Sequence, residues 1–303
     1  MSFKLINTTH RHCVFTIDEN LRPFFLKDRS LLDCLFHSVN SVVSHMFFKQ
    51  NKSMNFTPGF IMVLHTFGRD LKWNPHIHCL ISEGGYSDNG FWRNCTYFNY
   101  TYLRNAFRTA LLNELETRLG PSFKKVKATC YREHKEGFYV YAKPNKCDPN
   151  VVVKYIGRYL GRPVIATSRI DKYDGDFVTF HYNRHEDDAY IEETVPVMDF
   201  IKRLIQHIPE KHYKMIRYGG IYARHRDIDK KLLRAISRKK HHIYKSFNHW
   251  RNAILSSFGY DPLKCECGAT MLFLELYFNH KRVSLKEMYE KAMSHSRGIR
   301  SSA

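Results

Sequence analysis

The chain has 303 residues, with 48 Lys and Arg against 29 Asp and Glu, and its formal net charge is +19. Its content of 43% apolar and 15% aromatic residues is enough for a large core, which excludes wholesale disorder. This excess of positive charge indicates a polyanionic partner, nucleic acid first and an anionic membrane surface second. No run approaches ~18 uninterrupted apolar residues, so we expect no membrane association.

The eight cysteines are scattered along the chain, and residues 1–17 do not resemble a signal peptide. We therefore expect no disulfide framework and a reducing, cytoplasmic location. Cys265-Glu266-Cys267 is either half of a metal site or a pair of ordinary thiols near a turn.

The elements of the first half alternate between strands and helices. In chain order they are a strand at residues 12–17, a helix at 29–49, strands at 59–67 and 75–82, and a helix at 99–119. Asn74-Pro75 is expected to begin the strand at residues 75–82, and Gly84-Gly85 is expected to end it. Gly120-Pro121 is expected to end the last helix.

Further along, hairpins and short helices follow one another. We expect a hairpin of residues 126–132 with 138–142, a helix at 148–160, a hairpin of 177–182 with 190–195, a helix at 196–207 and basic helical material at 227–258. Strands beside helices, joined by hairpins, predict an α+β fold with an antiparallel sheet.

Two histidines lie in the strand at residues 75–82. In His76-Ile77-His78 the alternation of a strand puts both imidazoles on one face and Ile77 on the other. Such a pair can converge on one cation, or be two surface or hydrogen-bonded histidines. His65 is in the preceding strand. If residues 68–74 form a turn, it is a third ligand candidate, the alternative being a core histidine bonded to backbone.

Two tyrosines lie four residues apart in the helix expected at 148–160. Tyr155 and Tyr159 share one helical face, either as nucleophiles or as core residues. A phenol with a pKa near 10 needs a nearby cation to become a nucleophile, and Lys154 or Arg158 would supply one beside a metal ion. A second pair of this spacing, Tyr218 and Tyr222, encloses two glycines and does not indicate a helix.

The motifs agree in their order along the chain. The segments HCVFTI, LHTFG, NPHIHCLI and KYIGRYLGRP, followed by VTFHYNR, MDFIKRLIQHIPEKHYKMIRYGGIYARH and DPLKCECGATM, resemble HUH endonucleases, and most closely the two-tyrosine rolling-circle transposases of the insertion sequence 91 type. The likeness spans residues 9–274.

The resemblance implies a Rep-like HUH fold, an antiparallel sheet with flanking helices. It implies that His76 and His78, with His65 as a candidate third ligand, bind Mg²⁺ or Mn²⁺. It also implies that Tyr155 or Tyr159 cleaves single-stranded DNA at transposon ends and targets, through a 5′-phosphotyrosine. The implied location is the bacterial cytoplasm, with the nucleoid.

The chain departs from the family in two respects. Relatives often carry an N-terminal cysteine-rich zinc-binding domain, which we do not expect in this chain, and they tend to have His where Asn74 stands. We expect a catalytic domain at residues 1–165, a basic DNA-binding region with a β-hairpin and helices at 166–293, and a frayed tail at 294–303.

The basic charge is concentrated late in the chain. Residues 202–251 hold 15 Lys and Arg against three acids, a net +12, interleaved with tyrosines that can stack on unpaired bases. The alternative is a solvated basic helix face. The candidate DNA-binding residues are Lys154, Arg158, Arg162, Arg217, Arg224, Arg226, Lys230, Lys231, Arg234, Arg238, Lys239 and Lys240.

These features favour a transposase. Two alternatives stay open: a plasmid rolling-circle replication initiator or relaxase with the same chemistry, and a non-catalytic DNA-binding remnant of a transposase.

Overall fold

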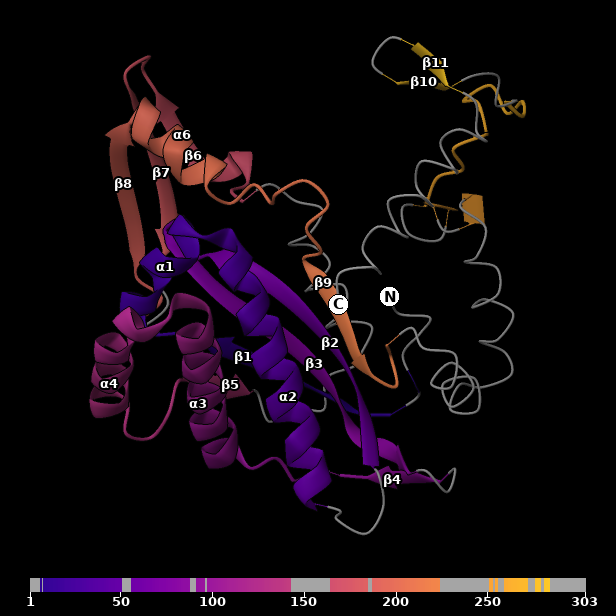
Figure 1. Ribbon diagram of the computed structural model, residues 1–303. Coiled ribbons are helices and arrows are strands. Elements are labelled where there is room, and N and C mark those ends of the chain that lie inside the picture. The colour runs from indigo at the N-terminus through magenta and orange to yellow at the C-terminus, as the bar shows by residue number, and fades with distance from the viewer. Residues whose placement is uncertain are drawn as a thin grey trace. The chain divides into compact units, whose positions relative to one another are not determined.

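The computed structural model describes residues 6, 8–50, 56–87, 91–95, 97–142, 164–184, 187–223, 251–252, 254–255, 259–271, 276–278 and 281–283. The chain divides into two compact units, Met1–Lys240 and His241–Ala303. The first unit holds the main sheet and its helices (Figure 1). The expected domain boundary after residue 165 lies inside this unit and stays a prediction.

The main sheet runs in the order β5-β1-β3-β2-β9, and β4 pairs with β3. Its strands are β1 (His10–Thr16), β2 (Phe56–Phe67), β3 (Trp73–Ser87), β4 (Trp92–Asn94), β5 (Val140–Ala142) and β9 (Ile216–Gly220). All of its pairings are antiparallel. β3 is therefore a central strand, with β1 on one side and β2 on the other, and the expectation of an α+β fold with an antiparallel sheet is confirmed.

Four helices of this unit pack on one face of the main sheet. They are α1 (Arg22–Lys27), α2 (Leu32–Gln50), α3 (Tyr100–Leu119) and α4 (Lys124–Glu133), with short 3₁₀ turns at Glu19–Leu21, Arg29–Leu31 and Pro121–Phe123. α3 begins as expected, since the Asn99 side chain accepts from the Tyr102 N–H. It ends at Gly120, whose φ of 75° suits a residue without a Cβ.

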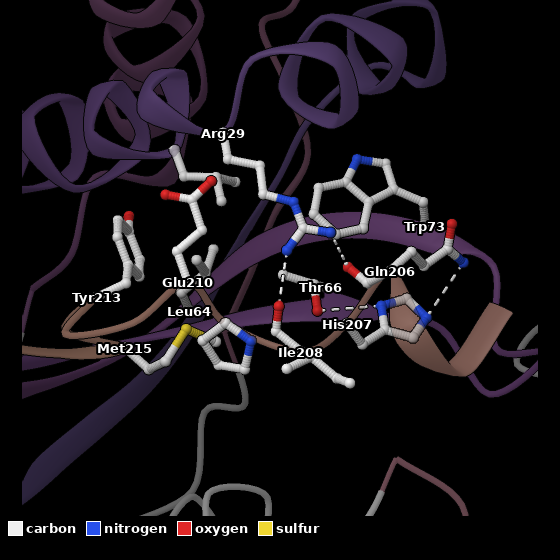
Figure 2. Close-up of a pocket in the computed structure, with 12 residues that line it drawn as sticks. Arg29, Leu64, Thr66, Trp73, Gln206, His207, Ile208, Glu210, Tyr213 and Met215 are labelled. Atoms are coloured by element: carbon white, nitrogen blue, oxygen red, sulfur yellow. Dashed lines mark hydrogen bonds between the residues drawn. The ribbon is translucent and has the colours of Figure 1, made fainter. Parts of the chain in front are cut away.

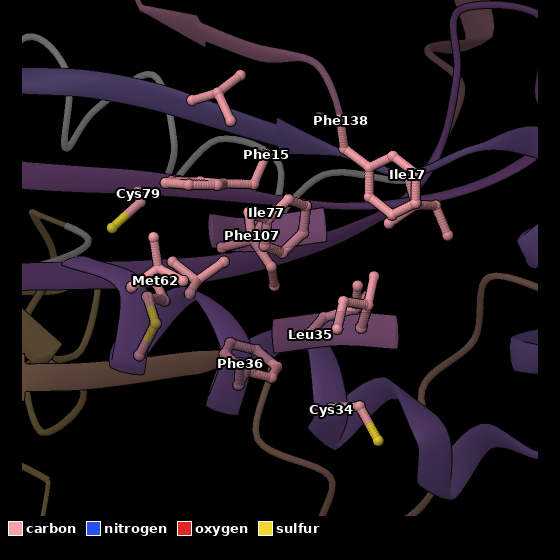
Figure 3. Packing of buried hydrophobic residues seen from close by; sticks show 14 of the residues in the cluster. Phe15, Ile17, Cys34, Leu35, Phe36, Met62, Ile77, Cys79, Phe107 and Phe138 are labelled. Atoms are coloured by element: carbon pink, nitrogen blue, oxygen red, sulfur yellow. The ribbon is translucent and has the colours of Figure 1, made fainter. Parts of the chain in front are cut away.

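The core lies between these helices and the sheet. Phe15 of β1, Met62 of β2 and Ile77 of β3 meet Phe36 of α2 and Phe107 of α3 (Figure 3). Phe107 packs edge-on against Phe15, with ring centroids 5.2 Å apart. Because side chains alternate along a strand, the residues between these positions face the opposite side of the sheet.

The glycines expected to end β3 lie inside it. β3 continues through Gly84-Gly85 to Ser87, and Gly84 pairs with Asn94 of β4. A Cβ at Gly84 would meet the Arg93 carbonyl oxygen at 2.5 Å. The glycine is thus a site of close backbone approach within the sheet and not a strand terminator.

The hairpin expected at residues 126–132 and 138–142 is wrong. Residues 126–132 belong to α4, where Val126 and Cys130, four residues apart, pack on the core. This spacing fits a helix as well as a strand when only one short segment is considered. Of the second segment, Val140–Ala142 forms β5 and pairs with β1.

A smaller sheet follows in the same unit. β6 (Ile170–Tyr173), β7 (Phe177–Asn183) and β8 (Tyr190–Pro196) pair antiparallel, and α6 (Val197–Ile205) packs on them through Phe200. The hairpin at residues 177–195 and the helix after it are confirmed. β6 was not expected.

Less of the second unit is described. β10 (Leu276–Phe278) and β11 (Lys281–Val283) form a hairpin, and Lys264 pairs with Thr270 around Cys265 and Cys267. All seven cysteines in the described ranges are free thiols, as expected. Of the helical material expected at 227–258, only residues 251–252 and 254–255 are described, and they are helical. Among the described helices, none is long and apolar enough to span a bilayer.

The packing of Phe107 allows a test of the core. We expect Phe107→Ala to lower the free energy of unfolding by about 3–5 kcal/mol, because a fully buried aromatic ring leaves a cavity. Phe91→Ala is the control, since Phe91 is 71% exposed and should change stability by less than about 0.5 kcal/mol. Urea unfolding followed by circular dichroism measures both. Equal losses in the two variants would contradict this core.

Candidate metal centre

Three histidines meet on the face of the main sheet opposite the helices. Antiparallel pairing of β2 with β3 places His65 directly across from His76, as the sequence predicted. His78 lies two residues further along β3, on the same face as His76. The intervening Ile77 is fully buried in the helix-covered core and fixes this orientation. A β-bulge in β2 follows His65 directly.

The ring nitrogens of the group lie close together. The Nε2 atoms of His76 and His78 are 3.1 Å apart. The rings of His65 and His78 have centroids 4.1 Å apart. One ligand nitrogen from each of the three histidines can be chosen so that all lie within 4.8 Å of one another. The three side chains named from the sequence are therefore brought to one place.

This group fits a divalent cation. Two nitrogens bound at about 2.1 Å in neighbouring positions of an octahedral ion lie about 3.0 Å apart, close to the separation of the His76 and His78 Nε2 atoms. His76 donates its Nδ1–H to the Asn74 carbonyl oxygen at 2.7 Å, which leaves Nε2 with its lone pair. A buried three-histidine group of this kind could hold a metal.

Burial keeps these imidazoles neutral. It lowers the pKa of His76 from its ordinary value to about 4 and that of His65 to about 3. For His65 the neighbouring His76 and His12 add to the effect. Burial also holds the pKa of His78 well below its ordinary value. Neutral imidazole is the form that binds metals, so no proton has to leave at neutral pH.

A fourth histidine, His12, touches the group and was missed in the sequence. It lies on β1 beside His78, and its Nε2 is 2.9 Å from His78 Nδ1. The planes of the two rings are 13° from parallel, and their centroids are 5.1 Å apart. Burial lowers the pKa of His12 to about 4. The available signal was His10-Arg11-His12, which alternates in a strand like His76-Ile77-His78. Only the tertiary fold brings His12 next to His78.

Of the other predicted site residues, the structure describes Arg217 alone, and it is not at this group. Arg217 lies on β9 opposite Met62, hence on the helix-covered face, where it forms an ion pair with Asp33 and stacks over the Phe36 ring. Tyr155 and Tyr159 lie outside the described residues. So do Lys154, Arg158, Arg162, Arg224, Arg226, Lys230, Lys231, Arg234, Arg238, Lys239 and Lys240.

A small pocket on the helix-covered side is lined by residues that hold the segment after α6 in place. Figure 2 shows Arg29 and Trp73 around residues 206–208. Arg29 donates to the carbonyl oxygens of Gln206 and Ile208, both at 2.7 Å. His207 donates its Nε2–H to the Leu71 carbonyl oxygen at 2.9 Å. These polar groups are occupied in fixing the segment after α6 to the main sheet, so the pocket is not our candidate site.

With this geometry established, comparisons identify the family. The family model Y2_Tnp, described as "Putative transposase", matches residues 59–229, more than half of the chain. The chain therefore belongs to this family. The matched range begins within β2 and includes all three histidines of the group. The resemblance to two-tyrosine transposases seen in the motifs is confirmed.

Two curated relatives are similar to the chain. The transposase for insertion sequence element IS801 of Pseudomonas savastanoi pv. phaseolicola is 31% identical over 225 residues, 70% of this chain and 54% of that protein. A protein of Sinorhizobium fredii named "Putative transposase y4qJ" is 28% identical over 244 residues, 74% of this chain and 61% of its own length. The chain thus spans little more than half the length of these relatives. No solved structure matches it.

The lowered histidine pKa values predict a pH dependence of stability. In the unfolded chain these histidines become protonated below about pH 6.5. In the folded chain they stay neutral down to about pH 4. With EDTA present, the free energy of unfolding should therefore fall from pH 7.5 to pH 5, by about 2 kcal/mol for each such histidine. His65→Leu should show a shallower fall in urea unfolding at the two pH values. An unchanged or rising stability toward pH 5 would contradict this burial.

Proposed function

We propose that this chain is the DNA nicking and joining part of a rolling-circle transposase. The observation that carries the proposal is the buried group of His65, His76 and His78 on paired strands of an antiparallel sheet, in a chain of the Y2_Tnp family. The similarity to the IS801 transposase supports transposition over plasmid replication or relaxase activity. The substrate in this proposal is single-stranded DNA at the ends of the element and at its target.

The sheet supports the proposed Rep-like HUH fold. The histidine pair lies on the central strand β3, and helices cover the opposite face. One face is therefore free of the α2 and α3 packing and carries the polar groups. The tyrosine helix of the family belongs beside this face in the proposal, with Tyr155 and Tyr159 as the two nucleophiles.

In the proposed reaction, the Oη of one tyrosine attacks the scissile phosphorus. The Tyr–O–P bond forms, the bond from phosphorus to the 3′-oxygen breaks, and the tyrosine proton is lost while the leaving 3′-oxygen gains one. The products are a 5′-phosphotyrosine and a free 3′-OH. The second tyrosine accepts the strand at the next cleavage, which suits a process in which one strand is cut, peeled off and rejoined.

The histidines hold the divalent cation in this scheme. Bound there, the cation supplies Lewis-acid polarisation of a phosphate oxygen. Three imidazole nitrogens suit a transition-metal ion better than Mg²⁺, which prefers oxygen ligands. Of the two ions expected from the family, Mn²⁺ is therefore the better probe.

The basic residues complete the proposal. The net +12 of residues 202–251 would neutralise phosphates on either side of the nick. The candidate residues there are Arg217, Arg224, Arg226, Lys230, Lys231, Arg234, Arg238, Lys239 and Lys240, and Lys154, Arg158 and Arg162 flank the tyrosines. Of these, Arg217 is already engaged by Asp33, so it is the weakest candidate. We retain residues 1–165 as the catalytic part and 166–293 as the DNA-binding part of the proposal.

The adduct test addresses the nucleophiles. The full chain is incubated with Mn²⁺ and single-stranded oligonucleotides that cover both ends of the element carrying the gene. A 3′-end label should move with the protein in SDS gels, because the nucleophile keeps the strand on the 3′ side of the nick. A 5′-end label should leave on a fragment with a free 3′-OH.

Tyr155→Phe/Tyr159→Phe should reduce the adduct to background. The matched control is Tyr97→Phe/Tyr173→Phe, two tyrosines that are 69% and 62% exposed, and it should form the adduct normally. An adduct that persists without Tyr155 and Tyr159 would refute the assignment of the nucleophiles. DNA retention with no adduct in the wild type would favour a non-catalytic remnant.

The metal ligands have a separate test. His76→Ala and His78→Ala should each bring Mn²⁺-dependent cleavage to background while filter binding of single-stranded DNA stays intact, because the ligands do not hold the strand. His65→Ala should raise the Mn²⁺ concentration for half-maximal cleavage at least about tenfold. His37→Ala is the control, since its side chain is 55% exposed on α2. Cleavage unaffected by His76→Ala or His78→Ala would remove the proposed metal site.

A further inference from the structure

His12 approaches His78 from the edge of the ring opposite the one that faces His76. His78 Nδ1 is 2.9 Å from His12 Nε2, and His78 Nε2 is 3.1 Å from His76 Nε2. The two nitrogens of one imidazole point in diverging directions, so His12 and the cation position are on opposite edges of His78. His12 is therefore placed to act on the ligand and not to bind the ion itself.

The protons of the three rings are coupled through these contacts. His76 carries its proton on Nδ1, which donates to the Asn74 carbonyl oxygen at 2.7 Å. Its Nε2 is then an acceptor, and His78 can donate its Nε2–H to it. In that arrangement His78 Nδ1 is an acceptor as well, and His12 donates its Nε2–H to it.

In a second arrangement, the hydrogen bond between His12 and His78 runs in the opposite direction. If His78 carries its proton on Nδ1, it donates to His12 Nε2, and His12 carries its own proton on Nδ1. The Nε2 atoms of His76 and His78 then both present lone pairs toward the space between them. Only this arrangement offers two ligands to one cation.

We propose that His12 is a positioning residue that accepts the Nδ1–H of His78 and so commits Nε2 of His78 to the divalent cation. This rests on the metal site of the proposed function. With a cation bound, the hydrogen bond between the two rings would run from His78 to His12, so that His12 is the acceptor. The proton on His12 Nε2 would then have moved to His78 Nδ1. His78 Nε2 would have lost its proton and His12 Nδ1 would have gained one from solvent, so no net proton is released.

The fold of β1 supports this role. β1 pairs with β3 over seven residues, with Val14 opposite His78 and Thr16 opposite His76. Cys13 and Phe15 are fully buried on the helix-covered face, which holds His12 on the face of the histidine group. The near-parallel planes of the two rings, with centroids 5.1 Å apart, suit a hydrogen bond between their nitrogens, which holds the His78 ring in one orientation.

The role of His12 as hydrogen-bond acceptor is tested by Mn²⁺ binding to the full chain, measured by the loss of the free-ion EPR signal. His12→Leu should weaken binding about 10–100-fold, the range for loss of a group that orients a metal ligand. His12→Gln should stay within about threefold of wild type, because its amide oxygen can accept at the former Nε2 position.

His10→Leu is the matched control. His10 is a buried histidine of the same strand and face, but its ring nitrogen bonds the Tyr222 hydroxyl at 2.6 Å instead of the histidine group. Its loss should leave Mn²⁺ affinity unchanged. Wild-type affinity in His12→Leu would overturn the proposal, and so would equal weakening by His12→Leu and His12→Gln, or by His10→Leu.

A measurement on the wild type needs no variant. In ¹⁵N-histidine spectra with diamagnetic Zn²⁺, the proton of His78 should be on Nδ1 and that of His12 also on Nδ1. A His78 proton that stays on Nε2 with Zn²⁺ bound would overturn the proposal. If the wild type binds neither ion, the metal site of the proposed function fails, and the role of His12 fails with it. Tight binding with no effect of His12→Leu overturns the role of His12 alone.

Discussion

The pleat of β3 is the constraint on which the rest of the structure depends. Successive side chains of a strand point to opposite faces, so one short segment serves two environments. Ile77 and Cys79 enter the core against α2 and α3, and His76 and His78 emerge on the other face. The helices can pack tightly only because the histidines are turned away from them, and the histidines stay in place because Ile77 is held in the core.

The same arrangement sets the chemistry of the group. Burial on this face of the sheet disfavours the imidazolium forms, so the histidines remain neutral, and neutral imidazole is the form that binds metals. Their nitrogens lie close together without charge repulsion. The positive charge of the chain is concentrated elsewhere in the sequence, with +12 of the +19 in residues 202–251. In the proposed function, attraction of a polyanion and coordination of a cation thus belong to different parts of the chain.

Much of the fold and of the histidine group could be predicted from the sequence, wherever a local pattern of residues indicated a single structure. The spacing of apolar residues in α2, Gly120-Pro121 at the end of α3 and the alternation around Ile77 each predicted one element or face correctly. The segment 126–132 was predicted wrongly because its few apolar residues fit both periods, and Pro121 in the turn before α4 did not settle the choice. His12 could not be found because its role depends on the register of β1 with β3, a long-range pairing that no local pattern reveals.

The central position of β3 also limits local opening of the backbone around His76 and His78. The segment around His76 and His78 is hydrogen-bonded to β1 on one side and to β2 on the other, with buried side chains beneath it. Backbone amides in such a place exchange with solvent only when the whole sheet opens. Edge elements such as β4 and β5, three residues each, can fray without disturbing the histidine group. The spacing of the histidines therefore persists through the local openings of the native state.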